Sequence, residues 1–383
     1  MQWTGPTLGA GIAFALSLGG LLLLNPIAQR AGLIDHPAGR KNHRAPTPVT
    51  GGLAMLGAIV ATGLLLRLNT SQAAQGFIVS AILVTLLGAA DDKWDLSWRL
   101  RIAGQAIIAL VMVYLGDIRV EHLGNAFGLD LPSLGPLSVP FTVFATVGII
   151  NAVNMVDGAD GLAGLLVLCA LVMLEAAAIY SGNSAVYESV PILIGAVAGF
   201  LVQNLRSPWQ PRARVFMGNA GSALLGLTIA CLSFRLTQNP AHPVNPVLAL
   251  WLIPIPIMDC LVLMVRRVRN GRSPFSADHN HAHHLMQEAG FGPTQAAITL
   301  AAFSCLCGLT AAVLLRLHVA HPTLMLAFAG LCLTWYWITS RRVRAVGFFR
   351  SLRGVKQAVT SPHALEGAAL FADPNRGAGA DMG

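Results

Sequence analysis

The sequence alternates long apolar segments with short polar stretches along most of its length. A membrane-spanning helix needs about 20 apolar residues, and fewer where neighbouring helices shield it. By that measure the pattern predicts eleven spans and an all-α, polytopic integral membrane helix bundle. The spans cover roughly residues 5–24, 51–67, 76–90, 101–116, 137–150, 162–180, 190–204, 221–236, 246–265, 295–315 and 322–339.

We expect these spans to form one transmembrane domain over residues 1–345, followed by a cytoplasmic tail over residues 346–383. The tail is rich in Gly and Ala after Pro362 and shows no periodicity, so its end is expected to be disordered. The apolar segment from Leu8 to Leu24 lacks a basic start and a small-residue cleavage site, which indicates a retained first span.

Composition excludes a soluble protein. The chain is 55% hydrophobic and only 11% charged, whereas soluble domains carry about 25% charged residues. Its six cysteines are scattered through apolar segments without a C-x-x-C pair. They are typical of buried small hydrophobic residues, and they indicate neither a disulfide framework nor a zinc site.

The basic residues predict the orientation of the bundle. Most of the 25 Lys and Arg residues fall in alternate loops and in the tail, and the other side has only Arg67, Arg119, Arg235 and Arg316. The positive-inside rule then places the N-terminus outside and the C-terminus in the cytoplasm. The net charge of +8 is thus a topology signal. We expect no nucleic-acid partner, because no aromatic-interleaved basic patch accompanies the charge.

The most polar stretch between two apolar segments runs from residue 151 to residue 164. Asn151 and Asn154 are three residues apart, as are Asp157 and Asp160, so each pair shares a face if the turn is helical. Charge at a bilayer boundary is costly and commonly marks a functional site. The alternative is a polar interfacial loop with an Asp at a helix N-cap, which this density of acids, amides and glycines disfavours.

Three further polar stretches lie on the predicted cytoplasmic side. Adjacent Asp91 and Asp92 repel each other, which a divalent metal, a bound cation or a general-base role would explain. The alternative is a helix end running into solvent, although acids are unfavourable at a helix C-terminus. The loop around Lys41 combines basic residues with Pro and Gly and could hold a phosphate, but taken alone it is commonly explained by topology. The glycine-flanked turn at Asn219 would direct backbone N–H groups toward an anion.

The last loop holds four histidines within six residues, namely His279, His281, His283 and His284. Such a cluster admits a zinc site, and the first and third have the i, i+4 spacing that zinc uses. Four arginines stand just upstream, however, and would repel a cation. Arg and His together are better matched to a diphosphate, which is the interpretation we favour.

Acids, amides and an Arg/His array at one membrane face are the parts of a phosphoryl-transfer site with a cytoplasmic cleft. A transporter or channel is the competing class. Its polar residues would follow a pathway near the middle of the bilayer, whereas these clusters sit at the ends of spans.

These motifs resemble the polyprenyl-phosphate N-acetylhexosamine-1-phosphate transferases, in particular the WecA-like branch. Asp91-Asp92 matches the paired acids of that family, and Asn151-x-x-Asn154-x-x-Asp157-Gly-x-Asp160 matches its signature loop. His281-Ala-His283-His284 looks like the H-x-H-H loop of the branch, and Arg267 falls where the branch has a functional arginine. The resemblance extends from about Asp35 to Ala297.

The resemblance implies an all-helical membrane enzyme that acts with Mg²⁺, or Mn²⁺ as an alternative. It would join a UDP-N-acetylhexosamine, most often UDP-GlcNAc, to undecaprenyl phosphate in the bacterial cytoplasmic membrane and release UMP. In that reading Asp91, Asp92, Asp157 and Asp160 are catalytic, and Asn154 and Asn219 ligate the metal. The residues expected to bind substrate are Lys41, Asn151, Arg267, His281, His283 and His284. A homodimer is a further possibility that the resemblance leaves undecided.

One position departs from the family pattern. The family has Asp in the Met-Gly-Asp-x-Gly-Ser turn, where it resembles a main Mg²⁺ ligand, and this chain has Asn219. An amide offers an oxygen but no charge, so metal affinity should fall. The alternative function that follows is a homologue of low activity that serves as a binding or scaffold protein.

Overall fold

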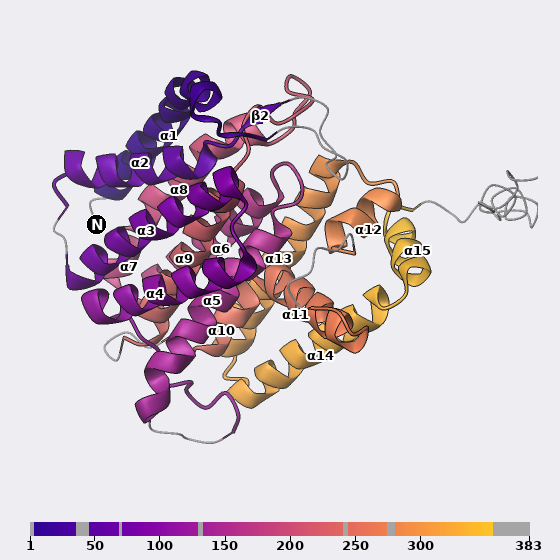
Figure 1. The fold of residues 1–383 in the computed structure, drawn as a ribbon. Helices are drawn as coiled ribbons and strands as arrows, with labels where there is room; N and C mark the ends of the chain where they lie inside the picture. Colours follow the sequence, from indigo (N-terminus) through magenta and orange to yellow (C-terminus); the bar gives the residue numbers. More distant parts are fainter. Residues whose placement is uncertain are drawn as a thin grey trace, which may run out of the picture.

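The computed structural model describes residues 4–35, 46–68, 71–128, 133–239, 244–273 and 280–354, and these are almost all helical (Figure 1). The helices are α1 Thr4–Ala31, α2 Gly51–Leu65, α3 Gln72–Trp94, α4 Trp98–Gly116, α5 Ser138–Val156, α6 Leu162–Ser181, α7 Ser184–Tyr187, α8 Val190–Asn204, α9 Gly218–Thr237, α10 Val247–Leu252, α11 Pro254–Arg269, α12 Ala282–Glu288, α13 Pro293–Arg316, α14 His321–Thr339 and α15 Arg342–Leu352. A 3₁₀ turn covers Gly135–Leu137, and the short strands β1 Ile34–Asp35 and β2 Thr47–Pro48 pair antiparallel.

The predicted all-α membrane bundle is confirmed. Within the described residues, nine helices are long and apolar enough to cross a membrane, so the chain is a multi-pass membrane protein. The other two predicted spans, over residues 51–67 and 246–265, do not form helices of that length. In the first, α2 has 15 residues, which gives a helix of about 22 Å against an apolar core of about 30 Å.

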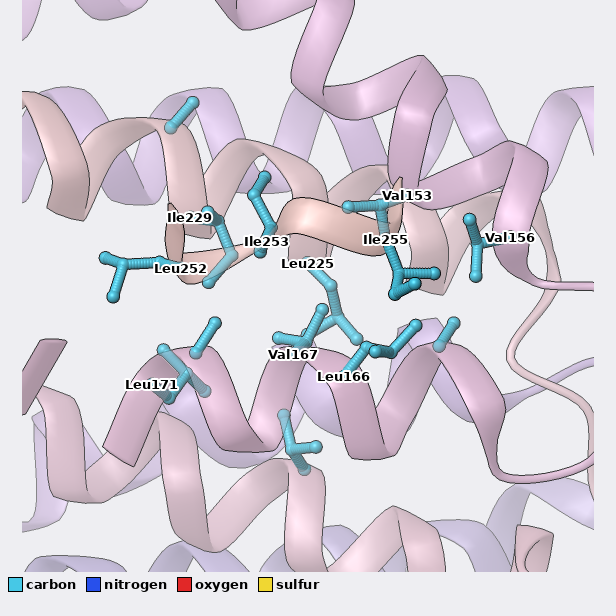
Figure 2. Close-up of a cluster of buried hydrophobic side chains, with 14 of the residues drawn as sticks. Val153, Val156, Leu166, Val167, Leu171, Leu225, Ile229, Leu252, Ile253 and Ile255 are labelled. Carbon is cyan, nitrogen blue, oxygen red and sulfur yellow. The ribbon is translucent and has the colours of Figure 1, made fainter. Parts of the chain in front are cut away.

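The predicted span over residues 246–265 is not a continuous helix. It is broken at Ile253, where α10 ends and α11 begins with Pro254. Proline has no N–H to donate to the preceding turn, and Pro256 follows two residues later, so the apolar run cannot continue as one helix. Ile253 lies within the hydrophobic cluster that α5, α6 and α9 also build, so the break is buried (Figure 2).

Helix α9 is the centre of the bundle, and nearly every residue from Ala220 to Thr237 is buried. It packs against α2, α3, α5 and α6. Glycines allow this closeness at its first turn. A Cβ on Gly52 of α2 would overlap the backbone nitrogen of Gly221, and a Cβ on Gly88 of α3 would overlap the backbone of Ala220. The backbones of three helices therefore meet at the start of α9.

The C-terminal part folds back on the bundle. In Figure 1, α12 and α15 lie at one end of the molecule and the chain's first helix turn and α7 lie toward the other. Arg342 pairs with Glu288 of α12 at 2.7 Å, and Phe349 is buried. Helix α15 continues across residue 345, the expected domain boundary, and the division into a transmembrane domain and a tail stays a prediction. Residues 355–383 lie outside the described part of the chain.

We expect Gly88→Ala to destabilise the bundle, because the added methyl group must push α3 away from α9. Overpacking of this kind costs about 1–3 kcal/mol. The matched control is Gly57→Ala in α2, where an added Cβ meets nothing within 4 Å. That variant should be neutral or slightly more stable, since alanine favours a helix over glycine by about 0.5–1 kcal/mol. The thermal unfolding midpoint in detergent measures both, and equal midpoints would contradict the close helix contact.

Candidate functional site

The paired acids end α3, and each has a different partner. Asp91 is buried. Its carboxylate accepts hydrogen bonds from the guanidinium of Arg101 at 3.0 Å and from the backbone N–H of Leu96 at 2.9 Å. Asp92 accepts from the backbone N–H groups of Asn219 at 2.8 Å and Ala220 at 3.2 Å. A carboxylate at a helix N-terminus is stabilised by the unpaired N–H groups and the dipole there. The anion that the glycine-flanked turn faces is therefore Asp92 of the same chain.

Gly218 makes this capping arrangement sterically accessible. Its φ of +71° lies in the left-handed region that favours glycine, and a Cβ there would lie 2.5 Å from a carboxylate oxygen of Asp92. The sequence pattern of a glycine before Asn219 thus serves the approach of α3 to α9.

The two predicted metal ligands are in direct contact. The side-chain nitrogen of Asn154, on α5, donates to the side-chain oxygen of Asn219 at 2.7 Å and to the hydroxyl of Ser222 at 2.8 Å. One turn earlier, Asn151 donates to Gln105 of α4 at 2.6 Å. A cavity of about 20 Å³, enough for about one water molecule, lies among these side chains. Its polar lining comprises Asp91, Arg101, Gln105, Asn151, Asn154 and Asn219.

Asp157 and Asp160 follow α5 and differ in their surroundings. Asp160 accepts from the guanidinium of Arg206 and from the backbone N–H of Ala213 at 3.2 Å, so it fixes the loop between α8 and α9. Asp157 is half-buried and has no side-chain hydrogen bond to the residues that the structure describes. Burial, together with the negative charges of Asp92 and Asp160, raises the pKa of Asp157 to about 7. Asp157 is the predicted acid whose carboxylate is left open to a ligand.

The histidine loop enters α12 and is anchored by an acid that the sequence analysis did not single out. Asp259 of α11 is buried and lies 2.9 Å from Nδ1 of His281. It also accepts from the backbone N–H of Ala282 at 3.3 Å and from the indole of Trp335 at 3.4 Å. A carboxylate on Nδ1 fixes the ring and leaves Nε2 for a ligand. The signal was a lone acid inside a predicted apolar span, which is expensive unless it has a role.

His283 joins the histidine loop, which carries His281, His283 and His284, to the acidic loop, which carries Asp157 and Asp160. Its ring packs on Gly158, where a Cβ would lie 2.5 Å from Nε2, and its centroid lies 4.1 Å from that of His284. Burial, with smaller effects of His284 and His281, lowers the pKa of His283 well below its ordinary value. The ring is therefore neutral at pH 7. Its Nε2 is buried without a hydrogen-bond partner among the described residues.

The remaining predicted residues differ in whether the structure describes them. Arg267 is buried on α11, two residues before Arg269, which is exposed and donates to the hydroxyl of Tyr336. Lys41 and His279 lie outside the described residues, so the structure does not place them. No group of three or more His, Cys, Asp or Glu side chains in the described part is arranged to hold a metal, so the zinc interpretation gains no support there.

Comparison with known proteins decides the family. The model of glycosyl transferase family 4 matches residues 74–237. An undecaprenyl-phosphate alpha-N-acetylglucosaminyl 1-phosphate transferase of Pasteurella multocida is 36% identical over 348 residues, which cover 90% of this chain and 95% of that protein. Proteins of the same name from Yersinia pestis and Escherichia coli K12 are each 34% identical, over 91% and 74% of this chain and 96% and 77% of theirs.

The chain belongs to glycosyl transferase family 4. The resemblance found in the sequence motifs is thereby confirmed at the level of the family. The family match includes the paired acids, the acidic loop and Asn219, and it ends before the histidine loop, which the longer alignments to relatives include. The roles of the individual residues of this family 4 protein stay predictions.

We expect the raised pKa of Asp157 to make stability depend on pH. An unfolded Asp has a pKa of about 3.9. Between that pH and about 7, the folded protein binds more protons than the unfolded chain, so the contribution of Asp157 to stability falls as pH rises. Asp157→Asn removes this pH-dependent loss of stability, because asparagine does not titrate.

The thermal midpoint of Asp157→Asn minus that of the native protein should therefore increase from pH 4 to pH 7.5 and then level off. The measurement uses chelator and no substrate. Glu188→Gln, which removes one exposed acid at the other end of the bundle, is the control. A difference that stays flat or decreases with pH would show that Asp157 is not a buried, charge-repelled acid.

Proposed function

We propose that this family 4 protein transfers GlcNAc-1-phosphate from UDP-GlcNAc to undecaprenyl phosphate and releases UMP. The contact of His283 with Gly158 is the observation that carries the proposal, because it joins an acidic loop and an Arg/His loop into one site. The names of relatives whose alignments cover most of the chain support the lipid acceptor and the sugar phosphate. The product would serve as the first lipid-linked sugar for cell-surface polysaccharide synthesis.

The proposed step exchanges one phosphorus–oxygen bond for another. An oxygen of the lipid phosphate attacks the phosphorus that carries the sugar, and the bond from that phosphorus to the bridging oxygen breaks, so the bridging oxygen leaves with UMP. Positioning and charge stabilisation dominate such reactions. Asp157, with its open carboxylate, is suited to orient or deprotonate the acceptor, whereas Asp91 and Asp92 position α4 and α9 through the bonds described above.

The opposite wall would hold the diphosphate of the UDP-sugar while UMP leaves. Arg267 supplies fixed positive charge from the last turn of α11. His281 is oriented by Asp259 and presents Nε2, and neutral His283 would form a hydrogen bond through its unpartnered Nε2. Asp160 would act through the loop it fixes, between α8 and α9. His284, Asn151 and Lys41 stay predicted substrate-binding residues.

The donors around Asn154 fit Mg²⁺ held jointly with substrate phosphates. Mg²⁺ commonly binds through one or two carboxylates, several waters and phosphate oxygens, so a full protein cage is not needed. Asp157 supplies an open carboxylate, and Asn154 and Asn219 supply amide oxygens. Burial is the largest cause of the raised pKa of Asp157, and the charges of Asp92 and Asp160 add to it; a cation would relieve that added repulsion. When bound, Mg²⁺ or Mn²⁺ would offset the charge of the diphosphate.

We further propose that the site faces the cytoplasm of a bacterium, with the protein in the cytoplasmic membrane and the N-terminus outside. Arg101 pairs with Asp91 and Arg206 pairs with Asp160, so described residues of two basic loops lie at the site, which supports this orientation. A soluble UDP-sugar could then enter from the cytoplasm while the lipid phosphate arrives along the bilayer.

The assay that tests the function is release of UMP from UDP-GlcNAc in the presence of undecaprenyl phosphate and Mg²⁺. We expect Arg267→Gln and His283→Gln to lower turnover by about 10²–10³-fold, the usual cost of removing a group that stabilises transition-state charge. Arg269→Gln is the matched control, because it removes the same charge from the same helix at a side chain held by Tyr336.

The control should retain nearly full turnover. Equal losses for all three variants would indicate a general electrostatic effect and contradict the assigned diphosphate site. Absence of UMP release from the native protein with any UDP-N-acetyl sugar would instead favour the alternative, a binding or scaffold protein whose activity is impaired by Asn219.

Asn219→Asp tests that alternative directly. An aspartate can accept the same hydrogen bond from Asn154, so the geometry is retained while one negative charge is added. Hard cations are held chiefly by carboxylates. We expect turnover to rise by about 10²–10³-fold and the Mg²⁺ concentration for half-maximal rate to fall. Ser222→Ala, which removes the other partner of Asn154, is the control and should not change the metal requirement. Unchanged turnover and metal requirement in Asn219→Asp would show that residue 219 is not a metal ligand.

A further inference from the structure

A polar pocket lies at the end of the bundle opposite the candidate site. Helix α9 connects the two, because Asn219 lies in its first turn and Arg235 in its last, and a helix of 20 residues is about 30 Å long. The pocket has a volume of about 200 Å³. Its walls come from the start of α3, the segment after α4, the loop before α7 and the end of α9. The polar lining residues are Asp117, Arg119, Asn183, Arg235, Gln238 and Asn239.

Asn183 supplies a buried donor with nothing to bind. Its side chain is 2% exposed, and its Nδ2 has no hydrogen-bond partner among the described residues. Leaving a buried polar group unpaired costs about 1–3 kcal/mol. The backbone of the same residue is fully used, since its N–H donates to Ala178 and its carbonyl accepts from Val186 and Tyr187. The backbone at Asn183 is therefore fixed, and a ligand in the pocket would satisfy the side-chain amide.

Arg235 supplies a positive charge without a carboxylate partner in the described part of the chain. Its neighbour Arg119 is different, because it pairs with Glu121 at 2.9 Å and with the exposed Asp117 at 3.8 Å. The positive-inside pattern of the sequence assigns most basic residues to the other end of the bundle. Of the four arginines that the sequence assigns to this end, two line the same pocket.

The pocket wall is held in place without using these groups. The side-chain oxygen of Gln238 accepts from the backbone N–H groups of Glu121 and His122, and its nitrogen donates to the carbonyl of His122. These bonds tie the end of α9 to the segment after α4. The free volume, the unpartnered amide and the unpaired guanidinium therefore belong to a fixed structure.

We propose that this pocket binds a phosphate group. Arginine and amide donors recognise phosphate oxygens by short, charge-assisted hydrogen bonds. The pocket lies where the spans end, which is the level of phospholipid head groups in a bilayer. An acidic phospholipid head group and a soluble phosphate are the two sources of that chemistry. The proposal is independent of the transferase reaction.

The experiment uses the full chain, purified in neutral detergent and stripped of lipid. Dioleoyl-phosphatidylglycerol is added in steps and its binding is measured by native mass spectrometry, and inorganic phosphate is titrated separately by calorimetry. Arg235→Gln is compared with Arg316→Gln, which removes the same charge from the last turn of another span at the same end of the bundle. Asn183→Ala is the second variant, and its thermal midpoint reports whether it folds.

We expect Arg235→Gln to weaken binding of one of the two probes at least tenfold, and Arg316→Gln to leave it within twofold. Loss of lipid binding alone identifies the head group as the source, and loss of phosphate binding alone identifies a soluble ligand. Equal effects of Arg235→Gln and Arg316→Gln, or no probe whose binding depends on Arg235, would overturn the proposal. Where Asn183→Ala does not fold, Arg235→Gln carries the test, because its half-buried side chain has no ion pair to lose.

Discussion

The N–H groups of Asn219 and Ala220 donate to Asp92, and these bonds fix where α9 begins relative to α3. Gly88 and Gly52 let the helix backbones approach that same turn, and Gly218 lets the carboxylate reach it. Because Asn219 is part of the turn, the amide that meets Asn154 is placed by the same contacts. The geometry of the acidic side of the site thus depends on close packing of helix ends, with few side chains involved.

The two walls of the site differ in their electrostatics. The acidic wall concentrates negative charge at a half-buried Asp157, whose pKa is raised to about 7. In the proposed site the opposite wall would combine buried Arg267 with His283, a ring that burial keeps neutral. A diphosphate between them would meet positive charge on one side. On the other side it would need a cation between its oxygens and the acids.

The roles of the site residues stay predictions, whereas the fold was largely predictable, because apolar length predicts spans and alternate loops must lie at the same end of the bundle. The partners within the site were not. Asp92 accepts from N–H groups 127 and 128 residues away in sequence, a contact that depends on how α3 packs on α9. Asp259 was overlooked because a single acid barely changes the hydropathy of its segment. The break at Ile253 was also overlooked because the span was predicted from hydropathy. Proline barely lowers the hydropathy of a segment, although it prevents a helical hydrogen bond.

The packing of α15 bears on how this chain can be shortened or joined to other proteins. Apolar content suggests that the membrane part is complete at residue 345, yet a cut there would remove the buried side chains of Val346 and Phe349. It would also leave α12 without most of the helix that covers it, with only the pair of Arg342 and Glu288 remaining. Since α12 carries His283 and His284, a truncated or fused version made at that boundary would lose support for its histidines while keeping every membrane span.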